Sequence, residues 1–155
     1  MEFVPVNLQK HLGLCIEFRK DAHIVSHGDT VDFSLSDTKA WFDRLSTNSK
    51  AGFFHLVNDN QIIGQTEFIS GLKDEYDQLY GYINLLYLTP EHRSQGLGNI
   101  LQNFIFTRFQ NHNCEYALLR YWPSNIQGKS FYRKHGWQDV GDIGERGQLA
   151  LKKLV

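Results

Sequence analysis

The sequence contains little cysteine and no excess of charge of either sign. Cys15 and Cys114 are the only two cysteines among 155 residues. They are too few for a disulfide framework and do not have the spacing of metal ligands, so we expect both to be buried as small apolar residues. Sixteen basic and seventeen acidic side chains give a net charge of −1. This balance provides no general attraction to nucleic acid or to an anionic membrane, and neither is an expected partner.

Long apolar runs and targeting signals are also absent. No window approaches the roughly 20 apolar residues of a membrane-spanning helix. The first residues lack the basic segment and apolar run of a secretory signal, so we expect a cytoplasmic protein. None of the seven histidines has the spacing of a metal-ligand pair, and we expect no metal site.

The chain does contain enough apolar material for one core, with 41% hydrophobic and 14% aromatic residues. No linker, repeat or low-complexity stretch divides it, so we expect a single domain over residues 1–155. Apolar periodicity and turn residues predict strands at Phe3–Val6, Gly52–Val57, Gln61–Ile69, Tyr82–Leu88, Glu115–Tyr121, Trp137–Val140 and Leu149–Leu154.

Four helices are expected between these strands. The first spans Leu8–Val25 behind an Asn7 cap, and the second follows an Asp37 cap and ends before Ser46–Ser49. The third spans Asn99–Gln110, and the fourth is opened by Pro123-Ser124-Asn125 and ends at Gly136. The predicted order is β-α-α-β-β-β-α-β-α-β-β, a mixed α+β sheet with helices on both faces.

One glycine-bearing turn indicates an anion site. The residues Arg93-Ser-Gln-Gly96-Leu-Gly98 join an expected strand to the start of an expected helix, where backbone N–H groups have no internal partner. Gly96 and Gly98 permit positive φ and allow a phosphate to approach the backbone, and Arg93 adds a fixed charge. Two glycines alone also fit a flexible turn. The stretch has neither the Gly-Lys-Ser/Thr of a Walker loop nor the third glycine of a dinucleotide fingerprint.

A second motif lies further along the chain, Asn125-Ile-Gln-Gly128-Lys-Ser-Phe131-Tyr132-Arg-Lys-His-Gly136-Trp137. Taken with Arg-x-x-Gly-x-Gly, it resembles the GNAT superfamily of N-acetyltransferases. In that family an Asn opens a helix, and an aromatic-Tyr pair precedes Lys-x-Gly-aromatic. Gly128 stands where the family usually has alanine. The two motifs cover Tyr82–Val140, and the order of elements extends the resemblance over most of the chain.

The resemblance implies a GNAT-like acyl-CoA N-acyltransferase fold in which strands Tyr82–Leu88 and Glu115–Tyr121 are parallel and splay apart around acetyl-CoA, a co-substrate. Tyr132 would be the catalytic residue and protonate the coenzyme sulfur. The implied coenzyme-binding residues are the main chain of Leu86 and Leu88, the side chains of Arg93 and Asn125, and the amides of Ser94, Gln95, Gly96, Leu97, Gly98 and Asn99.

The implied reaction is direct transfer of an acetyl group to a primary amine of a small molecule, peptide or protein. Two alternatives stay open, an acyltransferase that uses another acyl-CoA and a non-catalytic CoA-binding regulatory module. A homodimer is one expected state, since dimers are common in the family. The acceptor site would be shaped by three connecting segments, namely Ser26–Ser36, the expected acidic loop Gly71–Gln78 and the expected turn Gly141–Gly147. None of these segments identifies the acceptor.

The general base stays open. Asn84 and Leu85 stand where relatives often carry acids, which counts against a strongly cationic polyamine substrate. A water relayed by Asn84, Tyr82 or Tyr121 would serve, and so would Glu67. Each of these side chains also has an ordinary structural interpretation, the tyrosines as rings at the edge of the core and Glu67 as a solvated strand residue.

Overall fold

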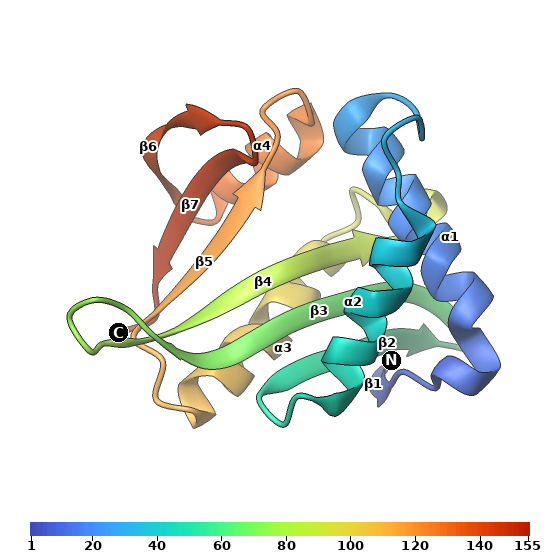
Figure 1. Cartoon of the computed structure of the whole chain (residues 1–155), viewed down its shortest axis with the longest axis horizontal. Helices are drawn as coiled ribbons and strands as arrows, with labels where there is room; N and C mark the ends of the chain where they lie inside the picture. The colour runs from blue at the N-terminus through green and yellow to red at the C-terminus, as the bar shows by residue number, and fades with distance from the viewer.

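The structure, a computed structural model, describes residues 1–155 and contains one seven-stranded sheet in the order β1-β2-β3-β4-β5-β7-β6 (Figure 1). Its strands are β1 (Glu2–Pro5), β2 (Ala51–Asn58), β3 (Gln61–Lys73), β4 (Leu79–Leu88), β5 (Tyr116–Tyr121), β6 (Gln138–Gly144) and β7 (Gly147–Lys153). Its helices are α1 (Leu8–His27), α2 (Leu35–Thr47), α3 (Leu97–Asn111) and α4 (Ile126–Lys134), with a single 3₁₀ turn η1 (Pro90–His92). The predicted element order and the mixed α+β class are confirmed.

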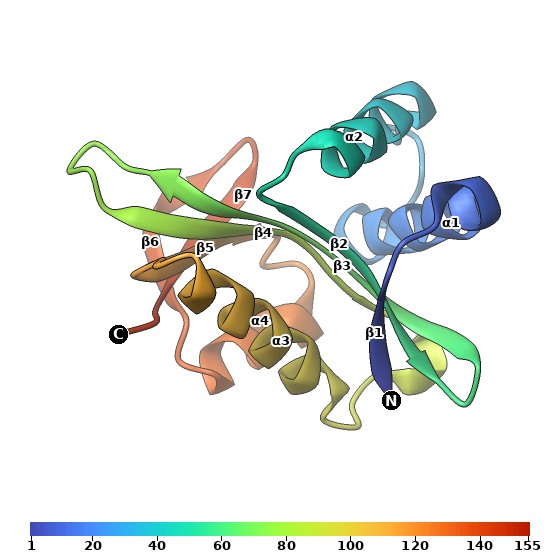
Figure 2. The same cartoon turned by 90° about the horizontal axis from the view of Figure 1, so that it is seen from below.

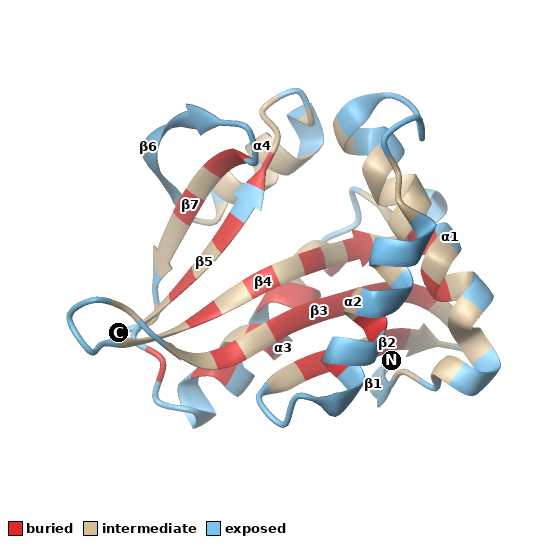
Figure 3. Cartoon of the chain, viewed as in Figure 1, coloured by how far each residue is buried: buried red, intermediate tan, exposed pale blue.

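The helices cover the sheet from both sides. Helices α1 and α2 lie on one face, and α3 and α4 lie on the other (Figure 2). The largest apolar cluster packs α3 against the central strands through residues such as Phe109 and Phe68, and a second cluster joins Cys15 and Phe42 to the opposite face. The buried residues therefore follow the central strands (Figure 3). Both cysteines are buried, as expected.

The sheet opens between β4 and β5, its only parallel pair. The two strands are paired from Tyr80 opposite Tyr116 to Ile83 opposite Leu119 and no further. Beyond this point β4 stays paired with β3, and β5 stays paired with β7. At the point of separation Asn84 forms a bulge, because β3 pairs with Ile83 and Leu85 and skips the residue between them. A bulge bends a strand and increases its local twist. The expected splay is therefore confirmed.

Several predicted boundaries were wrong. Ser34, not Asp37, caps α2, because the Ser34 hydroxyl accepts the Asp37 N–H at 3.2 Å and Asp37 lies inside the first turn. A serine three residues before an acidic residue is the more usual cap signature.

Two expected loops are also shorter than predicted. Strands β3 and β4 extend into the acidic segment, so only residues 74–78 form the loop. Asp74 closes it by accepting the N–H groups of Tyr76 and Gln78 at 2.8 and 2.9 Å. Most of the expected turn at Gly141–Gly147 belongs to β6, and only Glu145 and Arg146 connect it to β7. Glycines at the end of an irregular strand resemble turn residues in the sequence.

None of the helices has the length and apolar character needed to cross a lipid bilayer.

Candidate active site

The turn between β4 and α3 exposes the start of a helix. Ser94 and Gly96 both have left-handed backbone conformations, with φ of +61° and +81°. Gly96 is the residue before α3, and no side chain caps the helix there. A Cβ on Gly96 would meet no atom within 4 Å. The backbone conformation at Gly96 therefore favours glycine, whereas neighbouring protein atoms do not require it.

Consecutive amides of this turn are unused by the protein. The N–H groups of Ser94–Asn99 donate to no backbone oxygen, and none of them donates to a side chain. In the same region Gly98 permits close packing, since a Cβ there would lie 2.9 Å from the Phe131 ring. A run of free N–H groups at a helix start, with the positive end of the helix dipole, fits an anion such as a diphosphate.

Arg93 is held by the protein on two sides. Its Nη2 lies 2.7 Å from Asp21 Oδ2, and its Nε donates to the Leu88 carbonyl at 2.9 Å. Asp21 also accepts the Tyr87 hydroxyl at 2.6 Å, and the Arg93 guanidinium lies 5.4 Å from the centre of that ring. Burial first, and then Asp21, raise the pKa of Tyr87. Arg93 therefore ties α1 to the end of β4, and its Nη1 makes no hydrogen bond within the chain.

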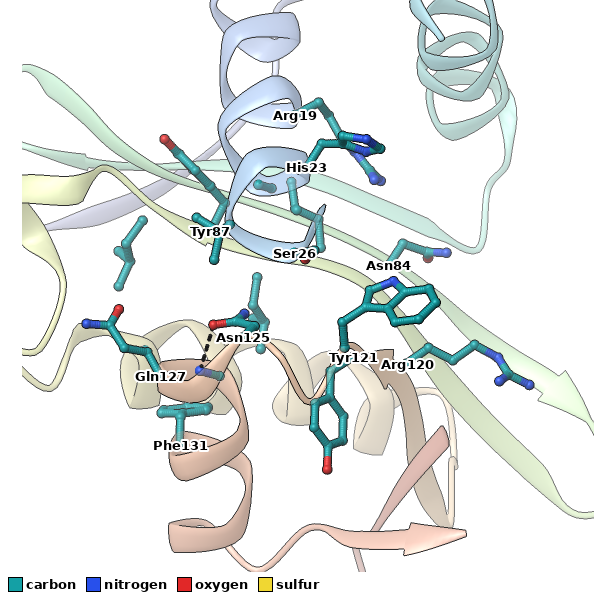
Figure 4. A pocket seen from close by; sticks show the side chains of 18 of the residues that line it. Arg19, His23, Ser26, Asn84, Tyr87, Arg120, Tyr121, Asn125, Gln127 and Phe131 are labelled. Atoms are coloured by element: carbon teal, nitrogen blue, oxygen red, sulfur yellow. Dashed lines mark hydrogen bonds between the residues drawn. The ribbon is translucent and has the colours of Figure 1, made fainter. Parts of the chain in front are cut away.

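A large cleft begins at this turn. It has a volume of about 1070 Å³ and runs along the end of β4 to the ends of α1, β5 and α4 (Figure 4). The residues predicted as site residues that line it are Leu86, Leu88, Arg93, Ser94, Gly96, Gly98, Asn99, Asn125 and Tyr132. Two predicted residues do not line it with the others. Leu97 is buried against Leu56 and Ile63, and Gln95 donates to the Glu91 carbonyl at 2.9 Å. For these two residues only the main-chain amides remain candidates for binding the coenzyme.

Helix α4 brings two predicted residues to the cleft. Asn125 caps this helix, and its Oδ1 accepts the Gly128 N–H at 3.1 Å (Figure 4). Tyr132 packs its ring against Tyr121 and Trp137, with centroid separations of 5.3 and 6.0 Å. Burial, with a smaller effect from Tyr121, raises the pKa of Tyr132 to about 12. This raised pKa keeps the hydroxyl protonated at neutral pH, and the hydroxyl makes no hydrogen bond within the chain.

Two of the base candidates are engaged elsewhere. Tyr121 donates its hydroxyl to Asp139 at 2.8 Å. Glu67 is fully buried and not solvated. Its carboxylate accepts bonds from Arg19, from Trp41 Nε1 at 2.6 Å and from Gln65 Nε2 at 2.9 Å. Both oxygens of this carboxylate are therefore occupied by hydrogen-bond donors of the chain.

The other two candidates border the bulge. Asn84 lines the cleft, and its Oδ1 is buried without a hydrogen-bond partner. Tyr82 lines a neighbouring hollow and not the cleft itself.

The structure adds one titratable residue that sequence reasoning missed. His23 lines the cleft from α1, and its Nε2 is buried without a partner. Burial first, and then the nearby His27, lower the pKa of His23; the two rings are 4.3 Å apart. Nothing in the spacing of the histidines indicates this position, because it depends on how α1 packs over β4.

The segments expected to shape the acceptor site differ in their positions. The segment Ser26–Ser36 contributes several side chains to the cleft, and Gly141–Gly147 contributes Arg146 to the neighbouring hollow. The Gly71–Gln78 segment lines neither. No group of three His, Cys, Asp or Glu side chains is arranged to hold a metal ion.

The chain is similar to proteins of one known family. Residues 17–137 match the family model described as the acetyltransferase (GNAT) family. A search of curated proteins found no match. Among solved structures, a PaiA N-acetyltransferase from Thermoplasma acidophilum in complex with coenzyme A is 19% identical, with a TM-score of 0.74 over 98% of each chain.

Two further structures illustrate the range of similar proteins. A ribosomal-protein-alanine N-acetyltransferase from Brucella melitensis is 12% identical, with a TM-score of 0.76 over 99% of each chain. An aminoglycoside 6'-N-acetyltransferase from Acinetobacter haemolyticus is 17% identical, with a TM-score of 0.72 over 93% of this chain and 95% of that one. At these identities the likeness establishes the fold and leaves the acceptor open.

Proposed function

The chain belongs to the acetyltransferase (GNAT) family, and we propose that residues 1–155 form one domain that transfers an acetyl group from acetyl-CoA to a primary amine. The acceptor is a small molecule, a peptide or a protein. The observation that carries the proposal is the run of free amides at Ser94–Asn99, beside a β4 that has separated from β5.

The residues fit the coenzyme in two places. The free amides of Ser94–Asn99 suit its diphosphate, and the Nη1 of Arg93, which has no partner in the chain, adds a positively charged hydrogen-bond donor. Beyond Asn84 one edge of β4 has no partner strand, which supports a role for the main chain of Leu86 and Leu88 in binding the amides of the pantetheine arm. Asn125 reaches the same cleft from the start of α4.

Acetyl-CoA supplies the acetyl group as a thioester, whose sulfur leaves as the amine nitrogen bonds to the carbonyl carbon. We assign Tyr132 the role of proton donor to that sulfur, because its raised pKa keeps the hydroxyl protonated and the hydroxyl is free of other bonds. Direct transfer requires no covalent intermediate on the protein.

The attacking amine must also lose a proton. We assign His23 as the acceptor of that proton, because it lines the cleft and its lowered pKa keeps the imidazole neutral at pH 7. Glu67 and Tyr121 are less suited, since both are bonded to other side chains.

Two measurements test the proposed function. Calorimetry with acetyl-CoA and with CoA should show binding of both, and release of free thiol should follow when a panel of primary amines is added. Binding without thiol release for any amine would favour the regulatory alternative. A larger kcat/KM with longer acyl-CoAs would favour a different acyl donor. Absence of binding to either form of the coenzyme would refute the proposal.

A further inference from the structure

A second hollow adjoins the cleft. It has a volume of about 530 Å³ and lies between α2, the middle of β4, the end of β5 and the turn before β7. The two spaces share several lining residues, including Arg19, Asn84 and Arg120. The hollow therefore opens onto the cleft at the bulge, the point where β4 and β5 separate. Asn84 and Arg120 are labelled in Figure 4 among the side chains that line the cleft.

The lining of this hollow is strongly cationic. It contains the arginines Arg19, Arg44, Arg120 and Arg146, and its only carboxylate is Asp37. Arg19 is paired with the buried Glu67. The other three arginines form no salt bridge. Because the whole chain has a net charge of −1, this concentration of positive charge is local and does not follow from composition.

These three guanidinium groups reach one hollow from different parts of the chain, Arg44 from α2, Arg120 from β5 and Arg146 from the turn before β7. Tyr82 lines the same hollow; burial raises its pKa, and the charges of Arg120 and Arg146 oppose that rise. On the other wall, Arg44 lies 5.5 Å from the ring centre of Trp41. Like charges held around one hollow repel each other, and a bound anion relieves that repulsion.

We propose that the acceptor is a small amine that carries an anionic group, either a carboxylate or a phosphate, and that Arg44, Arg120 and Arg146 bind this group. This inference rests on the proposed function. Guanidinium groups match the paired oxygens of both anions. The amino group would then lie toward the junction, where the buried Asn84 Oδ1 lacks a donor. A polyamine, which has a second positive charge in place of the anion, would be repelled.

The test compares amines that differ only in the anionic group. One pair is γ-aminobutyrate and n-butylamine, the other is phosphoethanolamine and ethanolamine, and putrescine serves as the dication. We expect kcat/KM for the anionic member of at least one pair to exceed that of its partner by about tenfold or more. The pair with the larger ratio distinguishes a carboxylate from a phosphate. Equal rates within both pairs, or a preference for putrescine, would overturn the inference.

Variants identify the side chains responsible. Arg44→Gln and Arg146→Gln should each reduce that preference by about tenfold, mainly through KM, with no change in affinity for CoA, because neither residue lines the cleft. The matched control is Lys39→Gln, which removes one positive charge from the exposed side of α2 outside both spaces. An anion preference that survives both arginine substitutions would overturn the inference.

A binding measurement separates this inference from the proposed function. Calorimetry with γ-aminobutyrate and phosphoethanolamine, in the presence of CoA, requires no turnover. If no amine is acetylated but an anionic amine binds more tightly than its partner, and Arg146→Gln removes the difference, the proposed function fails and the anion site stands. If amines are acetylated but neither anionic amine binds preferentially, the anion site fails and the proposed function stands.

Discussion

Replacing Tyr132 by phenylalanine tests the chemical step with little disturbance of the fold. The phenol ring packs against Tyr121 and Trp137, and phenylalanine keeps these contacts. The hydroxyl makes no hydrogen bond within the chain, so its removal should change the free energy of unfolding by less than about 0.5 kcal/mol. Loss of a positioned proton donor should lower kcat by about a hundredfold or more, which corresponds to about 2.7 kcal/mol in the activation free energy.

The assay is thiol release under saturating acetyl-CoA, with calorimetry to measure coenzyme affinity and thermal denaturation to measure stability. The matched control is Tyr116→Phe, which makes the same chemical change on β5 outside the cleft. The Tyr116 hydroxyl donates to Asp74 at 2.6 Å, so this variant should lose about 1 kcal/mol of stability and no activity. Unchanged kcat in Tyr132→Phe, or a loss matched by Tyr116→Phe, would show that the proton-donor assignment is wrong.

The pH dependence sharpens this prediction. The donor form of Tyr132 is lost only as the pH rises through its pKa, which burial raises to about 12. The wild-type kcat should therefore show no decline near pH 10, the ordinary tyrosine value, beyond that seen in Tyr132→Phe. A decline near pH 10 that disappears in Tyr132→Phe would contradict the argument that burial keeps this hydroxyl protonated.

Three other substitutions test separate parts of the site. Gly96→Val should weaken acetyl-CoA binding by about tenfold or more, because a branched side chain strains a φ of +81° and covers the amides; calorimetry that shows unchanged affinity would contradict the assignment of the turn. Glu67→Gln should lower the free energy of unfolding, measured by chemical denaturation, by about 2 kcal/mol, because the Arg19 side chain, which is 26% exposed, loses its counter-charge. An unchanged denaturation midpoint would show that the ion pair is dispensable for stability. His23→Gln should lower kcat with unchanged coenzyme affinity, and in the wild type kcat/KM should fall as the pH drops through the lowered pKa of His23; a profile identical in both proteins would exclude it as the proton acceptor.

The order of elements was predictable because its signals are local. Asn7 and Asn125 cap their helices as expected, since a cap depends on residues two or three positions away. Gly96 adopts the left-handed backbone conformation that glycine permits, whereas Gly98 does not. Where two local signals competed, the choice was wrong, as with Ser34 and Asp37 at the start of α2.

Buried polar groups were harder to foresee. Glu67 has the sequence context of a solvated strand residue. In the structure it is bonded to Arg19 of α1 and Trp41 of α2, which lie 48 and 26 residues away in the chain. A charge is stable in such a place only when its partners are present. No pattern within β3 indicates those partners.

The sequence by itself determined the order of the helices and strands and the two motifs, because periodicity and caps depend on near neighbours in the chain. Only the tertiary structure decided where β4 leaves β5, because the bulge at Asn84 depends on the register with β3. Packing likewise brought Arg44, Arg120 and Arg146 from three separate elements around one hollow. The free energy of placing like charges together depends on their distance in space, which their separation along the chain does not determine.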